Sequence, residues 1–181
     1  IGVIKKILQI ASTKQDLILD FFSGSATTAH AVMQLNAEDG GNRKYIMVQL
    51  PEETPEDSEA RKAGYDTIPE IAKERIRRAG KKIKKESPLT TQNLDTGFRV
   101  FRLADSNFEE VKKAPAEYDQ SQLDLFLNNV KSDRTDLDLL FGAMLSWGVQ
   151  LSLPMTSEEV DGKMIYSVND CLLYTSPSPR D

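Results

Sequence analysis

The sequence contains one short stretch in which an acid, two aromatic side chains and a small-residue turn follow one another directly. It reads Asp20-Phe21-Phe22-Ser23-Gly24-Ser25-Ala26-Thr27-Thr28. The apolar run that ends at Asp20 is typical of a buried strand, and the residues from Thr27 onward fit a helix. In open α/β sheets ligands bind at the carboxyl ends of strands, where a helix N-terminus offers unpaired N–H groups. A carboxylate at that place favours a cationic ligand group over a phosphate.

Spacing excludes three common types of site at this turn. A dinucleotide fingerprint needs Gly-x-Gly-x-x-Gly, and this turn contains only Gly24. A P-loop needs a Lys after its second glycine, and no Lys occurs between Lys14 and Lys44. A nucleophile elbow needs a glycine two residues before and after a serine, and neither Ser23 nor Ser25 has them.

Two apolar runs and the segment between them predict the frame that holds this turn. We expect strands over 17–22 and 44–50 and a helix over 27–35. Strand, helix and strand at this spacing form a βαβ unit with a parallel sheet. Because the two runs are continuously apolar, we expect both strands to be buried on both faces. The predicted fold class is α/β.

Amphipathic helices flank this unit. Apolar spacing predicts one helix over 2–12 and another from 68 to about 86, which a capping box of Thr67 and Glu70 opens. The remaining faces of the second helix are basic and could bind DNA phosphates. A solvated helix flank is the other interpretation, because the whole chain has a net charge of −5. The single histidine, His30, is interpreted as structural, because no Ser, Cys or Asp pattern supports catalysis by it.

A polar segment containing Pro88 separates this region from a second one. We expect an α/β core over 1–86 and a small mixed α/β appendage over 87–170. The elements predicted for the appendage are a strand over 97–103, helices over 123–130 and 136–147, and a hairpin around Asp161-Gly162.

Both ends of the sequence look cut. Helical periodicity begins at Ile1, and no Met precedes it. Residues 171–181 resemble the in-frame translation of a sequencing-library adapter, so we expect them to be an artefact outside the fold.

The composition excludes several classes of protein. With 39% apolar and 28% charged residues, the 181-residue chain differs from disordered sequences. No apolar run approaches the ~20 residues that span a bilayer, and we expect a cytoplasmic protein. A single Cys and a single His exclude a disulfide scaffold and a Cys-cluster zinc site, so no bound metal is expected.

The stretch from Asp20 to Thr28 resembles the cofactor motif of DNA amino-methyltransferases, Asp-Pro-Phe-x-Gly-x-Gly followed by Thr-Thr. Other segments are similar to one subgroup, the modification subunits of type III restriction–modification systems. These segments are 4–12, 27–33, 35–43, 48–52, 71–78, 96–101 and 139–148. Two positions depart from the pattern: Phe21 stands where many relatives have Pro, and Ala26 replaces a glycine. We expect Ala26 to be tolerated only with a negative φ.

The resemblance implies a Rossmann-like core that is dependent on S-adenosylmethionine. Asp20 would face the methionine ammonium, Phe22 would line the cofactor, and Gly24 would allow close backbone contact. Gln49 stands where relatives often have a ribose-binding acid, and Glu52 is a nearby substitute. The cofactor-binding residues implied in this way are Asp20, Phe21, Phe22, Ser23, Gly24, Ser25, Thr27, Gln49 and Glu52.

The same resemblance implies a function and partners. The intact enzyme would transfer a methyl group from S-adenosylmethionine to the N6 amine of adenine in double-stranded DNA, after flipping the base. It would act as a homodimer of modification subunits joined to a restriction subunit with helicase and nuclease activity. Two alternatives stay open: a nucleotide-binding α/β domain without methyl transfer, and a non-catalytic module that binds DNA or contacts another subunit.

The catalytic motif of that family is Asp-, Asn- or Ser-Pro-Pro followed by an aromatic residue. Pro-Pro occurs nowhere in this sequence. We expect the motif to precede Ile1 in the intact protein. No catalytic residue is therefore assigned, and the fragment alone is expected to be inactive.

Overall fold

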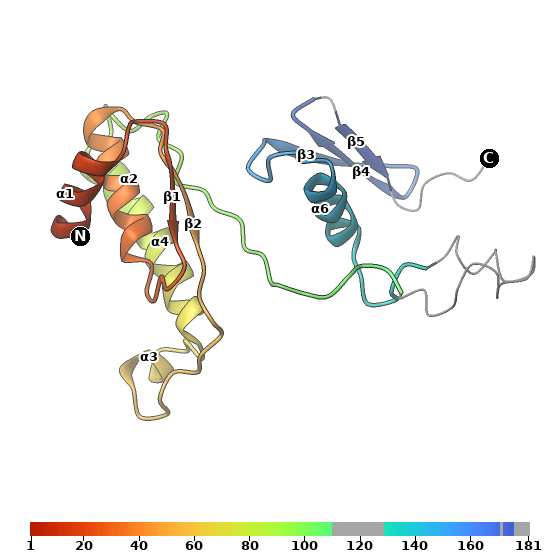
Figure 1. Ribbon diagram of the computed structural model, residues 1–181, viewed down its shortest axis with the longest axis horizontal. Helices are drawn as coiled ribbons and strands as arrows, with labels where there is room; N and C mark the ends of the chain where they lie inside the picture. The colour runs from red at the N-terminus through yellow and green to blue at the C-terminus, as the bar shows by residue number, and fades with distance from the viewer. Residues whose placement is uncertain (110–128, 171, 176–181) are drawn as a thin grey trace, which may run out of the picture. The chain divides into compact units, whose positions relative to one another are not determined.

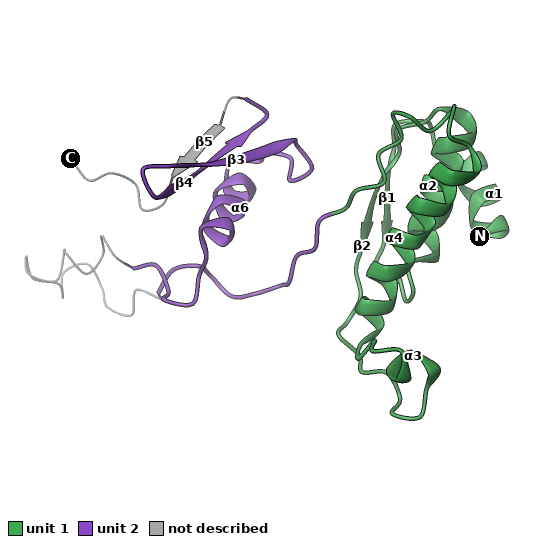
Figure 2. Ribbon diagram, turned by 180° about the vertical axis from the view of Figure 1, so that it is seen from behind, with its two compact units in different colours: residues 1–98 green, residues 99–181 purple. Residues whose placement is uncertain are grey.

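The computed structural model describes residues 1–109, 129–170 and 172–175. The chain divides into two compact units, Ile1–Phe98 and Arg99–Asp181 (Figure 2). Within the described ranges, no helix combines the length and the apolar character that crossing a membrane requires.

The first unit is built on a short parallel sheet. Strand β1 (Leu17–Asp20) pairs with β2 (Lys44–Met47), and helix α2 (Thr27–Asp39) connects them. This arrangement confirms the predicted βαβ unit and the mixed α/β class. Both strands are shorter than the apolar runs suggested, because the paired residues end at Asp20 and Met47.

Three helices lie on one side of this sheet: α1 (Gly2–Ala11), α2 and α4 (Ile68–Glu86) (Figure 1). Between α2, α4 and the sheet, Met33 packs in one cluster with Ile76 and Ile83. The apolar stripe expected on the helix from 68 to 86 is therefore confirmed. In a second cluster, Leu8 of α1 packs against Val32 of α2.

The expectation that both strands are buried on both faces is wrong for the described residues. Leu17 and Leu19 on β1 are 59% and 58% exposed, and Ile46 on β2 is 47% exposed. Successive side chains of a strand point to opposite faces, and the three helices cover one face alone. The face that carries Leu17, Leu19 and Ile46 is consequently apolar and open.

Helix α4 begins without the capping box that its sequence predicts. Thr67 is the N-cap residue, but its side chain accepts no capping hydrogen bond. Thr67 instead forms an antiparallel bridge with Glu53, and the neighbouring amide of Ile68 donates to the Glu52 carbonyl at 2.9 Å. This bridge closes the loop that follows β2, in which α3 (Glu59–Lys62) forms a single turn.

The first unit continues beyond α4, because the segment after it folds back onto that helix. A Cβ atom at Gly80 of α4 would lie 2.8 Å from the Cβ atom of Thr96, so this close approach requires glycine. Nearby, the guanidinium of Arg77 lies 5.5 Å from the ring centroid of Phe98.

The second unit combines helix α6 (Asp136–Ser146) with an antiparallel sheet. The sheet has the order β3 (Met155–Val160), β4 (Lys163–Val168) and β5 (Leu172–Thr175). Asp161 and Gly162 adopt φ values of +51° and +75°, and they join β3 to β4 as the predicted hairpin requires. The predicted helix over 136–147 is also confirmed, and its residues Leu140 and Met144 pack with Val168.

Three other predictions fare differently. The strand expected over 97–103 is wrong, because this segment has no paired neighbour among the described residues and a strand needs one. The helix expected over 123–130 lies mostly outside the described residues, which resume at 129. In the segment 171–181, residues 172–175 form β5, and the rest lies outside the described residues.

Candidate functional site

The turn between β1 and α2 forms the centre of the candidate site. Backbone hydrogen bonds fix it: the amide of Ser23 donates to the Val48 carbonyl at 3.1 Å, and the amide of Ala26 donates to the Ser23 carbonyl at 2.8 Å. Gly24 adopts a φ of +50°, and a Cβ atom there would meet nothing within 4 Å. The backbone at Gly24 is therefore open to close approach by a ligand.

Asp20 points into this turn. Its Oδ1 atom accepts a hydrogen bond from the amide of Phe22 at 3.3 Å, and its Oδ2 atom accepts one from the Thr28 hydroxyl at 2.6 Å. The carboxylate is thereby held at the end of β1 and next to the start of α2. Thr28 is a residue that sequence reasoning missed, although it follows Thr27 directly and carries a hydroxyl in the first turn of a helix.

Gln49 reaches the same turn from the end of β2. Its Oε1 atom accepts a hydrogen bond from the amide of Gly24 at 2.8 Å. The structure thus brings Asp20, Gly24 and Gln49 together at the carboxyl ends of two neighbouring parallel strands. Glu52 is exposed on the loop beyond Gln49, where its backbone bonds to Leu50 and Ile68.

Two phenyl rings stand beside the turn. The rings of Phe21 and Phe22 are tilted by 53° with centroids 5.1 Å apart. Phe21 is 63% exposed and Phe22 is 80% exposed. Two large exposed rings next to a carboxylate offer both an apolar surface and a charge to a small molecule.

Ala26 corrects one expectation. It adopts a φ of +59° and a ψ of +44°, so the prediction of a negative φ is wrong. The left-handed conformation costs a residue with a Cβ atom roughly 1–2 kcal/mol. Ala26 is fully buried in the cluster of Ala29 and Met33, and this packing holds the unfavourable conformation in place.

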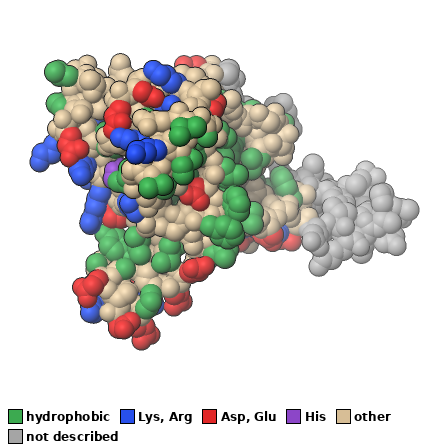
Figure 3. Space-filling model, turned by 60° about the vertical axis from the view of Figure 1, so that its left-hand side comes forward, with side chains coloured by type: hydrophobic (Ala, Val, Ile, Leu, Met, Phe, Trp, Pro, Cys, Tyr) green, Lys and Arg blue, Asp and Glu red, His purple; other side chains and the backbone are tan. Residues whose placement is uncertain are grey.

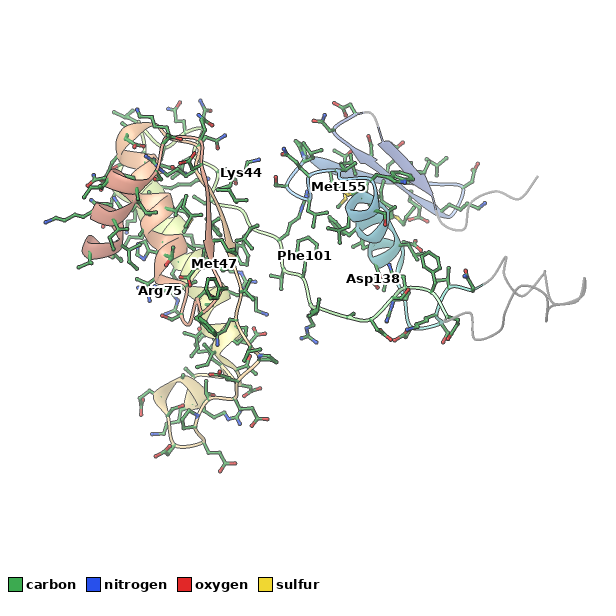
Figure 4. All side chains as sticks on the ribbon, viewed as in Figure 1. Lys44, Met47, Arg75, Phe101, Asp138 and Met155 are labelled. Atoms are coloured by element: carbon green, nitrogen blue, oxygen red, sulfur yellow. The ribbon has the colours of Figure 1, made fainter. Side chains whose placement is uncertain are left out.

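Ser25 ties the turn to α4. Its hydroxyl accepts a hydrogen bond from the Nη1 atom of Arg75 at 2.7 Å, and Figure 4 labels Arg75 on α4. Sequence reasoning missed this contact, because the two residues are far apart in the chain. Ser25 also borders a groove of about 480 Å³, whose lining includes His30 and Arg75 but neither Asp20 nor Gln49.

The described side chains give no support to a metal centre. Over residues 1–109, 129–170 and 172–175, no group of three or more His, Cys, Asp or Glu side chains could hold a metal ion.

The segment that contains this turn matches a known protein family. Residues 2–77, which contain α1, the β1–α2 turn and β2, match the family model of DNA methylases. This segment is therefore similar to DNA methylases.

The chain is more particularly a homologue of the Mod subunits of type III restriction–modification enzymes. The StyLTI Mod subunit of Salmonella typhimurium (strain LT2) is 48% identical over 103 residues, which are 57% of this chain and 16% of that protein. The EcoP15I Mod subunit of Escherichia coli is 40% identical over 103 residues, which are 57% of this chain and 14% of that protein. The EcoPI Mod subunit of Escherichia phage P1 is 30% identical over 184 residues, covering 98% of this chain and 27% of that protein.

These values confirm the resemblance inferred from the motifs. The chain spans 14% to 27% of the length of these three relatives and is thus related to a partial segment of them.

Proposed function

We propose that this chain is part of a site-specific DNA methyltransferase that transfers a methyl group from S-adenosylmethionine to the N6 amine of adenine. The observation that carries the proposal is the turn after β1, where Asp20 bonds to Phe22 and Thr28 on either side of Gly24, and Gln49 from the adjacent strand bonds to the Gly24 amide. Ligands of open α/β sheets bind at this edge. The finer fold that accompanies the proposal is a Rossmann-like core, of which β1, α2 and β2 form a part.

The residues at the turn fit S-adenosylmethionine chemically. This cofactor has a cationic sulfonium, which makes its methyl group electrophilic, together with an ammonium and a ribose. The Asp20 carboxylate suits the ammonium, and the open side of Gly24 suits a close backbone contact. The Gln49 Oε1 atom is bonded to Gly24, which leaves its Nε2 group as a donor for a ribose hydroxyl. The exposed ring of Phe22 suits the apolar parts of the cofactor.

The proposed role of this chain is to bind and orient the cofactor. Methyl transfer depends on alignment of two reactants, since the electrophile is already activated. The Pro-Pro motif that would grip the target amine is absent from this sequence, so we expect no methyl transfer by this chain alone. Double-stranded DNA, a second modification subunit and a restriction subunit are the partners proposed for the intact protein, because the relatives are named Mod subunits of restriction–modification enzymes.

Titration calorimetry with S-adenosylmethionine tests this proposal. We expect saturable binding to the chain, weakened about tenfold by Asp20→Asn, because a hydrogen bond to a charged group contributes roughly 1.5–3 kcal/mol. The matched control is Asp57→Asn, which removes the same charge from an exposed loop residue of the same unit. Circular dichroism checks that both variants keep the fold.

Two results would contradict the proposal. One is binding of a nicotinamide dinucleotide in the absence of S-adenosylmethionine binding, which would favour the nucleotide-binding alternative. The other is an equal loss of affinity in Asp20→Asn and Asp57→Asn, which would mean that net charge rather than the turn determines binding.

A further inference from the structure

The first unit carries a groove between α2 and α4 that the proposed cofactor site does not use. It measures about 480 Å³, and its polar lining includes Ser25 and His30 with Tyr65, Arg75, Arg78 and Lys82. Figure 3 shows Lys and Arg side chains gathered around the histidine on one face of the molecule. The groove lies outside the group formed by Asp20, Gly24 and Gln49, with which it shares no residue.

The three cations of this groove form one row. Arg75, Arg78 and Lys82 are three and four residues apart on α4, and this spacing places side chains on one face of a helix. The whole of α4 contains eight Lys or Arg and three Glu, a formal charge of +5 in a chain whose net charge is −5. Eight of the 23 Lys and Arg residues of the chain thus lie on the helix that borders the groove, and three of these eight line it.

The single carboxylate in the groove lining is already bonded. Glu74 accepts a hydrogen bond from the Nε atom of Arg78 at 2.7 Å, and its carboxylate lies 3.9 Å from Arg77. Arg75 donates to the uncharged Ser25 hydroxyl, and it forms no ion pair with any described residue. Lys82 is paired with Glu86, whose Oε1 atom lies 3.7 Å from its Nζ atom. The three cations therefore exceed the two carboxylates by one positive charge, and an anion can neutralise it.

Uncharged donors complete the lining. The Tyr65 hydroxyl accepts from Arg78 at 3.1 Å, which leaves its own proton for another acceptor. The pKa of His30 is lowered, first by burial and then by the positive charges of Arg75 and Lys82, while the Glu86 carboxylate acts in the opposite direction. His30 is the one histidine of the chain, so it can report on the charge of its surroundings.

We propose that this groove binds backbone phosphates of double-stranded DNA. The proposal rests on the proposed function, which makes DNA the substrate of the intact enzyme. A row of cations along a helix matches a row of phosphates better than a single free anion, and Tyr and Ser hydroxyls are common phosphate donors in DNA complexes. Such contacts position the duplex and carry no base specificity. Of the two interpretations of this basic helix, the proposal takes phosphate binding for the face that borders the groove.

The first experiment measures the affinity of the chain for fluorescently labelled duplex DNA over a series of NaCl concentrations. The variant is Arg78→Gln with Lys82→Gln, which leaves the Arg75–Ser25 bond untouched. We expect about tenfold weaker binding, regardless of DNA sequence. We also expect the slope of log affinity against log salt to fall by roughly 1.8, since each lost phosphate contact removes about 0.9.

The matched control is Lys84→Gln with Lys85→Gln. This pair removes the same charge from the same helix at exposed residues that do not line the groove. Equal losses of affinity in the two double variants, or no binding of DNA by the unaltered chain, would overturn the proposal.

The second experiment follows the imidazole of His30 by NMR during a pH titration. A phosphate in the groove offsets the positive charges of Arg75 and Lys82, so duplex DNA should raise the pKa of His30. A shift caused by inorganic phosphate but not by DNA would assign the groove to a free anion and overturn the proposal.

Calorimetry with S-adenosylmethionine separates this proposal from the proposed function. The groove variant Arg78→Gln with Lys82→Gln should keep the cofactor affinity of the unaltered chain. The unaltered chain could fail to bind S-adenosylmethionine while the groove variant still loses DNA affinity. That result would refute the cofactor assignment and support the phosphate groove.

Discussion

The two units of this chain differ in the direction in which their neighbouring strands run and in how these strands are connected. In the first unit, β1 and β2 run parallel and must be connected by α2 and the loops around it. In the second unit, β3 and β4 are antiparallel and are joined by Asp161 and Gly162 alone. A parallel pair needs a long crossover, and the carboxyl ends of its strands meet at one edge. The candidate site lies at that edge. The parallel sheet of the first unit, which needs the longer connection, is therefore the one that creates a place where a ligand can bind.

The two units also differ in what secures their contacts. The second unit depends on an apolar cluster, in which Leu140 and Met144 of α6 are almost completely buried. The first unit adds a buried polar connection: Asn36 of α2 bonds to both the amide and the carbonyl of Arg43, at 3.2 and 2.9 Å. This connection sets the start of β2 relative to the end of α2. We therefore expect the units to respond separately to different kinds of substitution.

The largest expected effect is that of Leu140→Ala, which opens a cavity in the second unit. Such a substitution costs roughly 2–5 kcal/mol of the free energy of unfolding. Trp147, the single tryptophan, lies in this unit, and His30 lies in the other. In a urea titration, the fluorescence transition of Trp147 should move to lower urea while the NMR transition of His30 stays unchanged. Equal movement of both transitions would show that the two units unfold as one.

A smaller effect is expected from Asn36→Ala, which acts on the first unit. It leaves the buried backbone groups of Arg43 without their partner, at a cost of about 1–3 kcal/mol. The His30 transition should move and the Trp147 transition should not. Gln34→Ala is the control on the same helix: Gln34 bonds to the Glu38 side chain at the surface, so its loss should change stability by about 0.5 kcal/mol or less. Because alanine has the highest helix propensity, neither substitution weakens α2 in that respect. A similar loss in both variants would mean that the connection to Arg43 contributes no more than a surface hydrogen bond.

The smallest expected effect has the opposite sign. Ala26→Gly relieves a left-handed alanine that costs roughly 1–2 kcal/mol, although glycine adds unfolded-state entropy of roughly 0.5–1 kcal/mol. The first unit should gain up to about 1 kcal/mol. Ala29→Gly, in the same cluster but within the regular part of α2, should lose about 1 kcal/mol. Destabilisation by both variants would show that burial of the Ala26 methyl group outweighs its backbone strain.

The sequence predicts the elements of both units better than it predicts their surroundings. The βαβ unit, the helix stripe around Ile76 and the Asp161-Gly162 hairpin follow from periodicity and turn chemistry, which are local. The exposure of Leu17 and the absence of a strand over 97–103 depend on which elements cover or pair with them. A run of apolar residues does not show whether another strand pairs with it or whether a helix covers its second face.

The candidate site shows the same division. The motif places Asp20 and Gly24 in one turn, because they are close in sequence. The bonds of Ser25 to Arg75 and of Gly24 to Gln49 join residues that come from different elements, and only the folded chain brings them together. The left-handed Ala26 was missed because steric preference alone argues against it, whereas its burial in the core compensates for the strain.

Because Gln49 is bonded to the Gly24 amide, a ligand oxygen can reach this N–H group only by exchange with the Gln49 side chain. An incoming oxygen that reaches this N–H must first displace the Oε1 atom already seated there. The free energy that this oxygen gains is then the difference between its own hydrogen bond to Gly24 and the one that Gln49 loses, and this difference is small. The Gly24 amide therefore adds little to affinity, and a ligand at this turn must gain its affinity from the Asp20 carboxylate, the Gln49 Nε2 group and the two phenyl rings.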